Sequence, residues 1–75
     1  MDQRELKMLM RAKTRLVRGL TNLLKDDAEQ LSDDMNSFDI FRMEETVADA
    51  KRTAQQLIDA TTELEYYLYL AKKDA

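Results

Sequence analysis

The sequence predicts an all-α fold, an antiparallel two-helix hairpin that dimerises into a four-helix bundle. Proline is absent, and Gly19 is the only glycine among 75 residues. Helix-forming residues such as Ala, Leu, Glu, Lys, Arg and Gln dominate the composition. Two long stretches carry apolar residues at helical spacing, and the polar cluster SDDMNSFD at 32–39 separates them. We expect one domain over 1–75, with a helix at about 2–33, a turn at about 34–37 and a second helix at about 38–73.

The first predicted helix has a broad apolar stripe whose members follow one another at intervals of three and four residues. Its members are Leu6, Leu9, Met10, Lys13, Leu16, Val17, Leu20, Leu23, Leu24, Ala28 and Leu31. Gly19 lies at the edge of this stripe, where glycine costs about 1 kcal/mol relative to alanine. We expect a neighbouring backbone to approach Gly19 closely, and the alternative is an exposed glycine that is simply tolerated.

The second predicted helix has the most regular pattern in the chain, with apolar or small residues at alternating intervals of three and four. These are Ile40, Met43, Val47, Ala50, Ala54, Leu57, Thr61, Leu64, Leu68 and Ala71, with Ile58, Ala60 and Tyr67 beside them. Asn36 or Ser37 is a suitable N-cap for this helix. The short connection makes the two helices antiparallel neighbours.

Charge is unevenly distributed along the chain. Residues 1–25 carry seven bases and two acids, whereas residues 26–49 carry nine acids and one base. In an antiparallel hairpin, Lys13 falls near Asp59, Lys7 near Glu63 and Glu65, and Lys25 near Asp49, so the bases have partners. Arg11, Arg15 and Arg18 form a row that could instead contact phosphates of a nucleic acid. We do not favour nucleic-acid binding, because the first helix has no aromatic residue for base stacking.

No catalytic constellation is present in the sequence. The chain has no histidine and no cysteine, which excludes the usual zinc sites and the common nucleophile and base pairs. A glycine-rich phosphate loop is also absent. We therefore expect no enzyme activity, no cofactor and no metal. The lack of a long apolar run predicts an intracellular protein without a membrane segment, and cytoplasmic and nuclear locations are not distinguished.

The apolar stripes are wider than a single helix pair needs, which predicts a homodimer. The second predicted helix ends in LEYYLYLAKK at 64–73, a stretch that is apolar on nearly every side and rich in tyrosine. This end could alternatively dock on a different protein as part of a larger intracellular complex. The residues expected to mediate self-association are Leu9, Leu16, Leu23, Ile58, Tyr66, Tyr69 and Leu70.

The stretch LKMLMRAKTRLVRGLTNLL at 6–24, an acidic linker and MEETVADAKRTAQQLIDATTELEYYL at 43–68 together resemble a known segment. This segment is the helical start of Gag polyproteins from Bel/Pao-type LTR retrotransposons. The comparable positions of the first helix are Lys13, Leu16, Arg18, Leu20 and Leu23, whereas Val17 departs from the threonine common in that family. The resemblance implies an assembly role at the N-terminus of a structural polyprotein, with protease, polymerase and zinc knuckles elsewhere.

Overall fold

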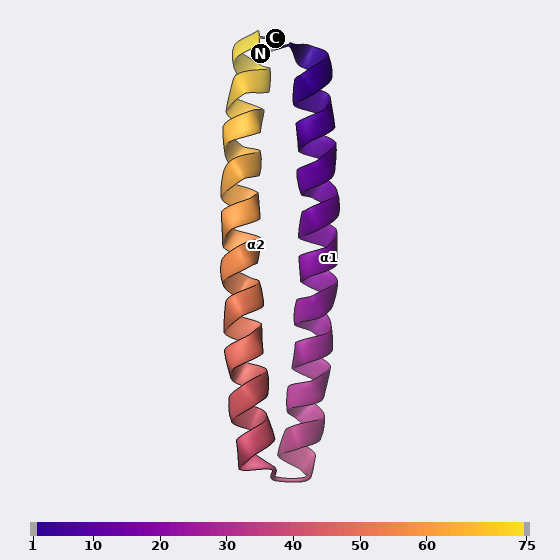
Figure 1. Ribbon diagram of the computed structural model, residues 1–75, viewed down its shortest axis with the longest axis vertical. Helices are drawn as coiled ribbons and strands as arrows, with labels where there is room; N and C mark the ends of the chain where they lie inside the picture. Colours follow the sequence, from indigo (N-terminus) through magenta and orange to yellow (C-terminus); the bar gives the residue numbers. More distant parts are fainter. Residues whose placement is uncertain (1, 75) are drawn as a thin grey trace.

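The computed structural model describes residues 2–74 and contains two antiparallel helices joined by a short loop (Figure 1). Helix α1 spans Gln3–Asn36, and helix α2 spans Ile40–Asp74. The two ends of the chain lie together at one end of the hairpin, and the loop at 37–39 closes the other. The predicted all-α hairpin is confirmed. The turn lies slightly later than the predicted 34–37, because α1 continues through Asn36.

Both helices begin at an aspartate. The Asp2 carboxylate accepts a hydrogen bond from the backbone N–H of Arg4 at 3.3 Å, and the Asp39 carboxylate accepts one from the backbone N–H of Arg42 at 3.2 Å. Each carboxylate satisfies an N–H group that has no partner within its helix. Asp39, rather than the predicted Asn36 or Ser37, is therefore the N-cap of α2.

Helix α1 ends in a Schellman motif whose left-handed position is occupied by Phe38. The backbone N–H of Phe38 donates to the Met35 carbonyl at 3.0 Å, and that of Asp39 donates to the Asp34 carbonyl at 2.9 Å. Phe38 has φ 51°, in a region that glycine enters without strain and other residues enter at a cost. Its side chain is 68% exposed, so little packing compensates for the strain.

Replacing Phe38 with glycine is expected to stabilise the hairpin by about 1 kcal/mol, because the left-handed strain is removed while little contact is lost. Phe41 provides the matched control, since it is 81% exposed but lies inside α2. Phe41→Gly should destabilise the hairpin by about 1 kcal/mol through helix propensity. Thermal unfolding by circular dichroism measures both variants, and a destabilising Phe38→Gly would contradict the strain at this position.

The core is a single seam between the helices. The least exposed positions of α1 follow one another at alternating intervals of four and three, and those of α2 match them. On α1 the seam consists of Leu6, Met10, Lys13, Val17, Leu20, Leu24, Asp27, Leu31 and Asp34. On α2 it consists of Met43, Thr46, Ala50, Thr53, Leu57, Ala60, Leu64, Tyr67 and Ala71. The buried hydrophobic side chains among the described residues are Leu6, Leu20 and Ala60.

Half of the predicted α2 stripe lies outside this seam. Ile40, Val47 and Leu68 are 45%, 42% and 47% exposed. The more polar Thr46 and the small Ala60 are buried instead, at 8% and 3% exposed. Helix α2 is therefore rotated relative to the orientation that its most hydrophobic residues predict, and a second apolar stripe faces outward.

The hairpin is long and thin. It measures 53 by 14 by 13 Å, and its radius of gyration is 16.8 Å, against about 11 Å for a compact domain of this length. Its accessible surface is 6055 Å², whereas a compact protein of this mass exposes roughly 4,800 Å². The excess surface is comparable to what a protein buries in a stable interface. Neither helix, over residues 2–74, contains a stretch both long and apolar enough to cross a membrane.

Candidate interaction surfaces

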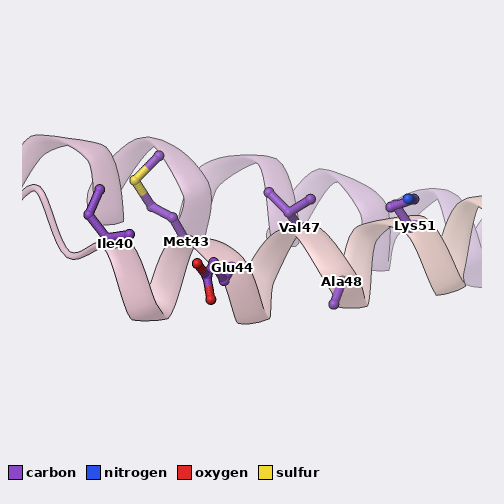
Figure 2. Close-up of a pocket in the computed structure, with 6 residues that line it drawn as sticks. All are labelled: Ile40, Met43, Glu44, Val47, Ala48 and Lys51. Carbon is purple, nitrogen blue, oxygen red and sulfur yellow. The ribbon is translucent and has the colours of Figure 1, made fainter.

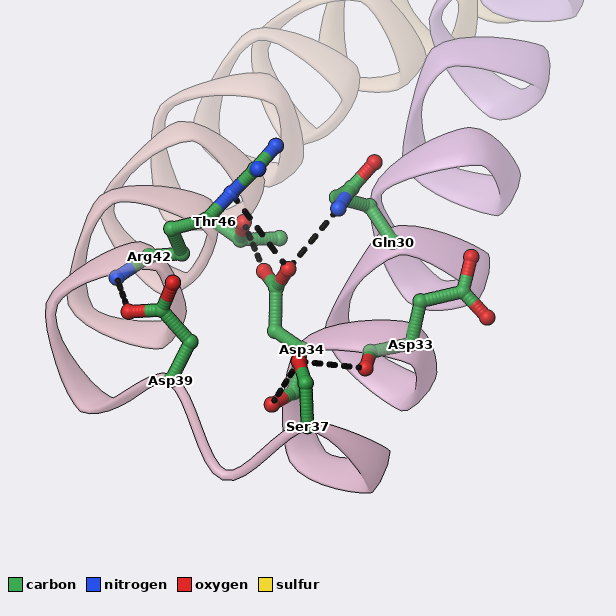
Figure 3. A network of polar contacts seen from close by, with 7 residues as sticks. All are labelled: Gln30, Asp33, Asp34, Ser37, Asp39, Arg42 and Thr46. Carbon is green, nitrogen blue, oxygen red and sulfur yellow. Dashed lines mark hydrogen bonds and ion pairs between the residues drawn. The ribbon is translucent and has the colours of Figure 1, made fainter.

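A buried carboxylate near the loop organises a cluster of polar side chains that joins the two helices (Figure 3). Asp34 is 3% exposed. Its Oδ1 accepts a hydrogen bond from Gln30 Nε2 at 2.8 Å, and its Oδ2 accepts one from Thr46 Oγ1 at 2.9 Å. Arg42 Nε lies 3.6 Å from Oδ1 and forms an ion pair. Three partners therefore compensate the burial of one carboxylate.

This cluster connects the two helices. All of its donors belong to the hairpin itself, and the bond between Asp34 and Thr46 joins α1 directly to α2. We expect a buried polar pair of this kind to disfavour other registers, because sliding one helix would separate the carboxylate from Thr46 and Arg42 and leave it only Gln30. No cluster of acidic side chains arranged to hold a metal ion occurs in residues 2–74.

The main ion pair in the middle of the hairpin joins Lys13 to Glu63. The Lys13 Nζ and Glu63 Oε2 atoms are 2.6 Å apart. The hydrogen bond to Glu63 raises the pKa of Lys13 above its ordinary value, while desolvation opposes the shift. Because the lysine pKa is raised, the stabilisation from its charged form is fully present below the ordinary lysine pKa and is lost as the pH rises from there through the raised pKa. Glu63 lies about one helical turn beyond the predicted partner Asp59, which reflects the later turn.

The other predicted ion pairs between the helices do not form. Over the described part of the chain, Lys7 and Lys25 have no acidic partner within ion-pair distance, and the same holds for Arg11, Arg15 and Arg18. All five side chains are exposed. The predicted pairing of Lys7 and Lys25 with α2 is therefore wrong, and all five bases face solvent.

Four of the exposed bases lie in one row along α1. Arg4, Arg11, Arg18 and Lys25 follow one another at seven-residue spacing, and we call them the basic row. Arg15 lies outside this row, on the edge of α1 that points away from α2. The structure therefore brings Arg11 and Arg18 together and separates Arg15 from them.

The predicted association residues of α1 form an exposed row on the opposite flank of the helix. Leu9, Leu16 and Leu23 also follow one another at seven-residue spacing, and they are 38%, 45% and 54% exposed. We call them the leucine row. Leu16 lines a shallow groove together with Gln56, Asp59, Ala60 and Glu63 of α2. The leucine row and this acidic edge of α2 thus share one broad side of the hairpin, which we call the leucine face.

Gly19 lies on the leucine face between Leu16 and Leu23. A Cβ atom built at Gly19 would meet no described atom within 4 Å. The expected close approach of a neighbouring backbone is therefore absent within the hairpin, and the glycine is exposed, as the alternative interpretation held.

The outward stripe of α2 lies on the other broad side. Figure 2 shows an open groove along α2 that is lined by Ile40, Met43 and Val47, together with Glu44, Ala48 and Lys51. Ile40, Val47 and Leu68 belong to one row, which we call the α2 row, and Ile58 lies beside it at 56% exposed. The α2 row faces away from the leucine face. It therefore lies on the same broad side of the hairpin as the basic row, and we call this side the basic face.

The tyrosines near the end of α2 are exposed. Tyr66 and Tyr69 are 57% and 60% exposed, and Leu70 is half-buried. The Tyr66 and Tyr67 rings lie 6.1 Å apart between centroids, and only Tyr67 belongs to the seam. Leu70 and Tyr66 lie on the leucine face, whereas Ile58 lies on the basic face. The seven predicted association residues are therefore divided: five lie on the leucine face, Ile58 lies on the basic face, and Tyr69 lies on the outer edge of α2.

Comparisons of this chain with the models of known protein families, with curated proteins and with solved structures give no match. Function is therefore inferred from the surfaces described above.

Proposed function

We propose that this chain is a non-catalytic protein-protein interaction module that self-associates. The observation that carries the proposal is the pair of exposed apolar rows, the leucine row on one face and the α2 row on the other. Each face has three large exposed apolar side chains on helical repeat positions, and exposed apolar side chains that share one face are typical of interfaces.

The thin seam supports the same proposal. Few side chains are fully buried, and the chain has no disulfide to restrict the unfolded state. Ordering costs about 1.5 kcal/mol per residue, which a single helix pair hardly offsets. Packing two hairpins into a four-helix bundle would bury a second seam for each helix. An assembly role of this kind also agrees with the resemblance to the start of Gag polyproteins.

Self-association explains the surface better than nucleic-acid binding does. The basic row is suited to phosphates, but it shares its face with the α2 row of Ile40, Val47 and Leu68, whose side chains gain nothing from a polyanion. No aromatic side chain accompanies the basic row on α1. A second protein surface would cover both the charged and the apolar row.

The melting temperature of the chain is expected to rise with protein concentration, because association stabilises the folded state by mass action. Replacing Tyr66, which lies on the leucine face, with alanine should reduce this rise, since a tyrosine that is 57% exposed contributes a large contact area to an interface. Both proteins should melt at the same temperature when dilute. Circular dichroism melts over a hundredfold range of concentration measure this, and a melting temperature independent of concentration would refute self-association.

A further inference from the structure

The two broad faces of the hairpin carry opposite charge. On the basic face, α1 contributes five bases and no acid, while the charges of α2 cancel. The bases of α1 are Arg4, Lys7, Arg11, Arg18 and Lys25, and the charges of α2 are Glu44, Lys51, Glu65 and Lys72. On the leucine face, acids outnumber bases on both helices. They are Glu5, Asp26 and Asp33 of α1, and Glu45, Asp49, Asp59 and Glu63 against Arg42, Arg52 and Lys73 of α2.

Two of the three α2 bases on the leucine face are already engaged within the hairpin, whereas the α1 bases on the basic face are not. Arg42 pairs with Asp34, and Arg52 Nη1 lies 3.2 Å from Asp49 Oδ1. In contrast, none of the α1 bases on the basic face has an acidic partner within ion-pair distance in the described residues. The basic face therefore offers unpaired positive charge, and the leucine face offers excess negative charge.

We infer that self-association joins unlike faces, the basic face of one copy to the leucine face of the next. This inference rests on the proposed self-association and specifies its geometry. Two hairpins can be stacked with the basic face of one against the leucine face of the other. If one of them is then turned by half a rotation about the axis perpendicular to these faces, its α1 lies over α2 of its neighbour. The basic row then meets the acidic edge of α2, and the α2 row meets the leucine row. Both the charges and the apolar side chains are complementary in this arrangement.

Contacts between like faces do not have this complementarity. Two basic faces would bring bases of two α1 helices together, and two leucine faces would bring acids together, so both are opposed by repulsion. In a pair joined through unlike faces, one copy keeps a free leucine face and the other keeps a free basic face. Further copies can therefore add, and the assembly grows beyond a pair as concentration rises.

Two variants, each with a single blocked face, test this geometry. Leu16→Gln with Leu23→Gln blocks the leucine face, and Val47→Gln with Ile58→Gln blocks the basic face. The replaced side chains are at least 42% exposed, and glutamine favours helix, so both variants should fold. Phe41→Gln with Thr62→Gln is the matched control, because both residues are exposed on the outer edge of α2 between the faces and neither lines a groove. Circular dichroism confirms that each variant is helical.

Each blocked variant alone should associate at least roughly tenfold more weakly than the wild type, and the control should not differ from it. An equimolar mixture of the two blocked variants should form a one-to-one complex, because each supplies the face that the other lacks. Multi-angle light scattering after size-exclusion chromatography measures these masses. The complex should also weaken in 1 M salt, which screens the charges.

Other outcomes overturn the inference in distinguishable ways. If only one variant dissociates, or if the mixture does not recover a complex, like faces are in contact, and self-association itself still stands. If the wild type stays a monomer at every concentration, the proposed function fails together with the inference.

Discussion

Replacing Asp34 with alanine is expected to destabilise the hairpin by about 2–3 kcal/mol. The substitution removes the bond to Thr46 Oγ1 and leaves that hydroxyl, which is 8% exposed, without its partner on α1. It also removes the ion pair with Arg42 near the loop. Urea unfolding, followed by circular dichroism, measures the free energy of unfolding.

The double variant Asp34→Leu with Thr46→Val is the control for this prediction. It replaces both buried polar groups with apolar ones, so neither is left without a partner, and most of the lost stability should return. Thr46→Val alone should cost about 1–2 kcal/mol, because the buried carboxylate loses one donor. If Asp34→Ala were neutral, the cluster would have no role in holding the helices together.

The second large effect is expected at Leu20, which is 5% exposed at the centre of the seam. Leu20→Ala should destabilise the hairpin by about 2–4 kcal/mol, through lost burial and the cavity that remains. Leu16 is its neighbour on the leucine face and is 45% exposed. Leu16→Ala should hardly change the stability of dilute protein, but it should weaken association of concentrated protein.

Urea unfolding at low and at high protein concentration separates these two roles. Leu20→Ala should destabilise the protein similarly at both concentrations, whereas Leu16→Ala should do so mainly at the higher one. Equal losses for the two variants in dilute protein would mean that the leucine row contributes to the hairpin and not to association.

The sequence predicts the two helices because their composition and spacing agree over more than 30 residues each. It also predicts most of the α1 seam, since Leu6, Val17 and Leu20 belong to the predicted stripe, but it misses Asp27 and Asp34. The stripe is too wide, however, to show that Leu9 and Leu16 lie outside the seam. Residue type alone does not decide which of two adjacent rows faces the partner helix.

The orientation of α2 could not be predicted from hydrophobicity. Val47 is more apolar than Thr46, yet Thr46 is buried because it donates to Asp34 on the other helix. The register also depends on the loop, and a phenylalanine at the left-handed position gives no signal of the kind that a glycine there would give. The orientation of α2 and the register of the two helices therefore become visible only in the three-dimensional structure. The exposed α2 row, and with it the two-faced surface, follows from them.

Sedimentation equilibrium of the wild-type chain tests the central claim of self-association most directly. Measurements from low micromolar to millimolar concentration at physiological salt should give an average mass that rises steadily above the 8.8 kDa of one chain. A mass of 8.8 kDa at every concentration would contradict self-association.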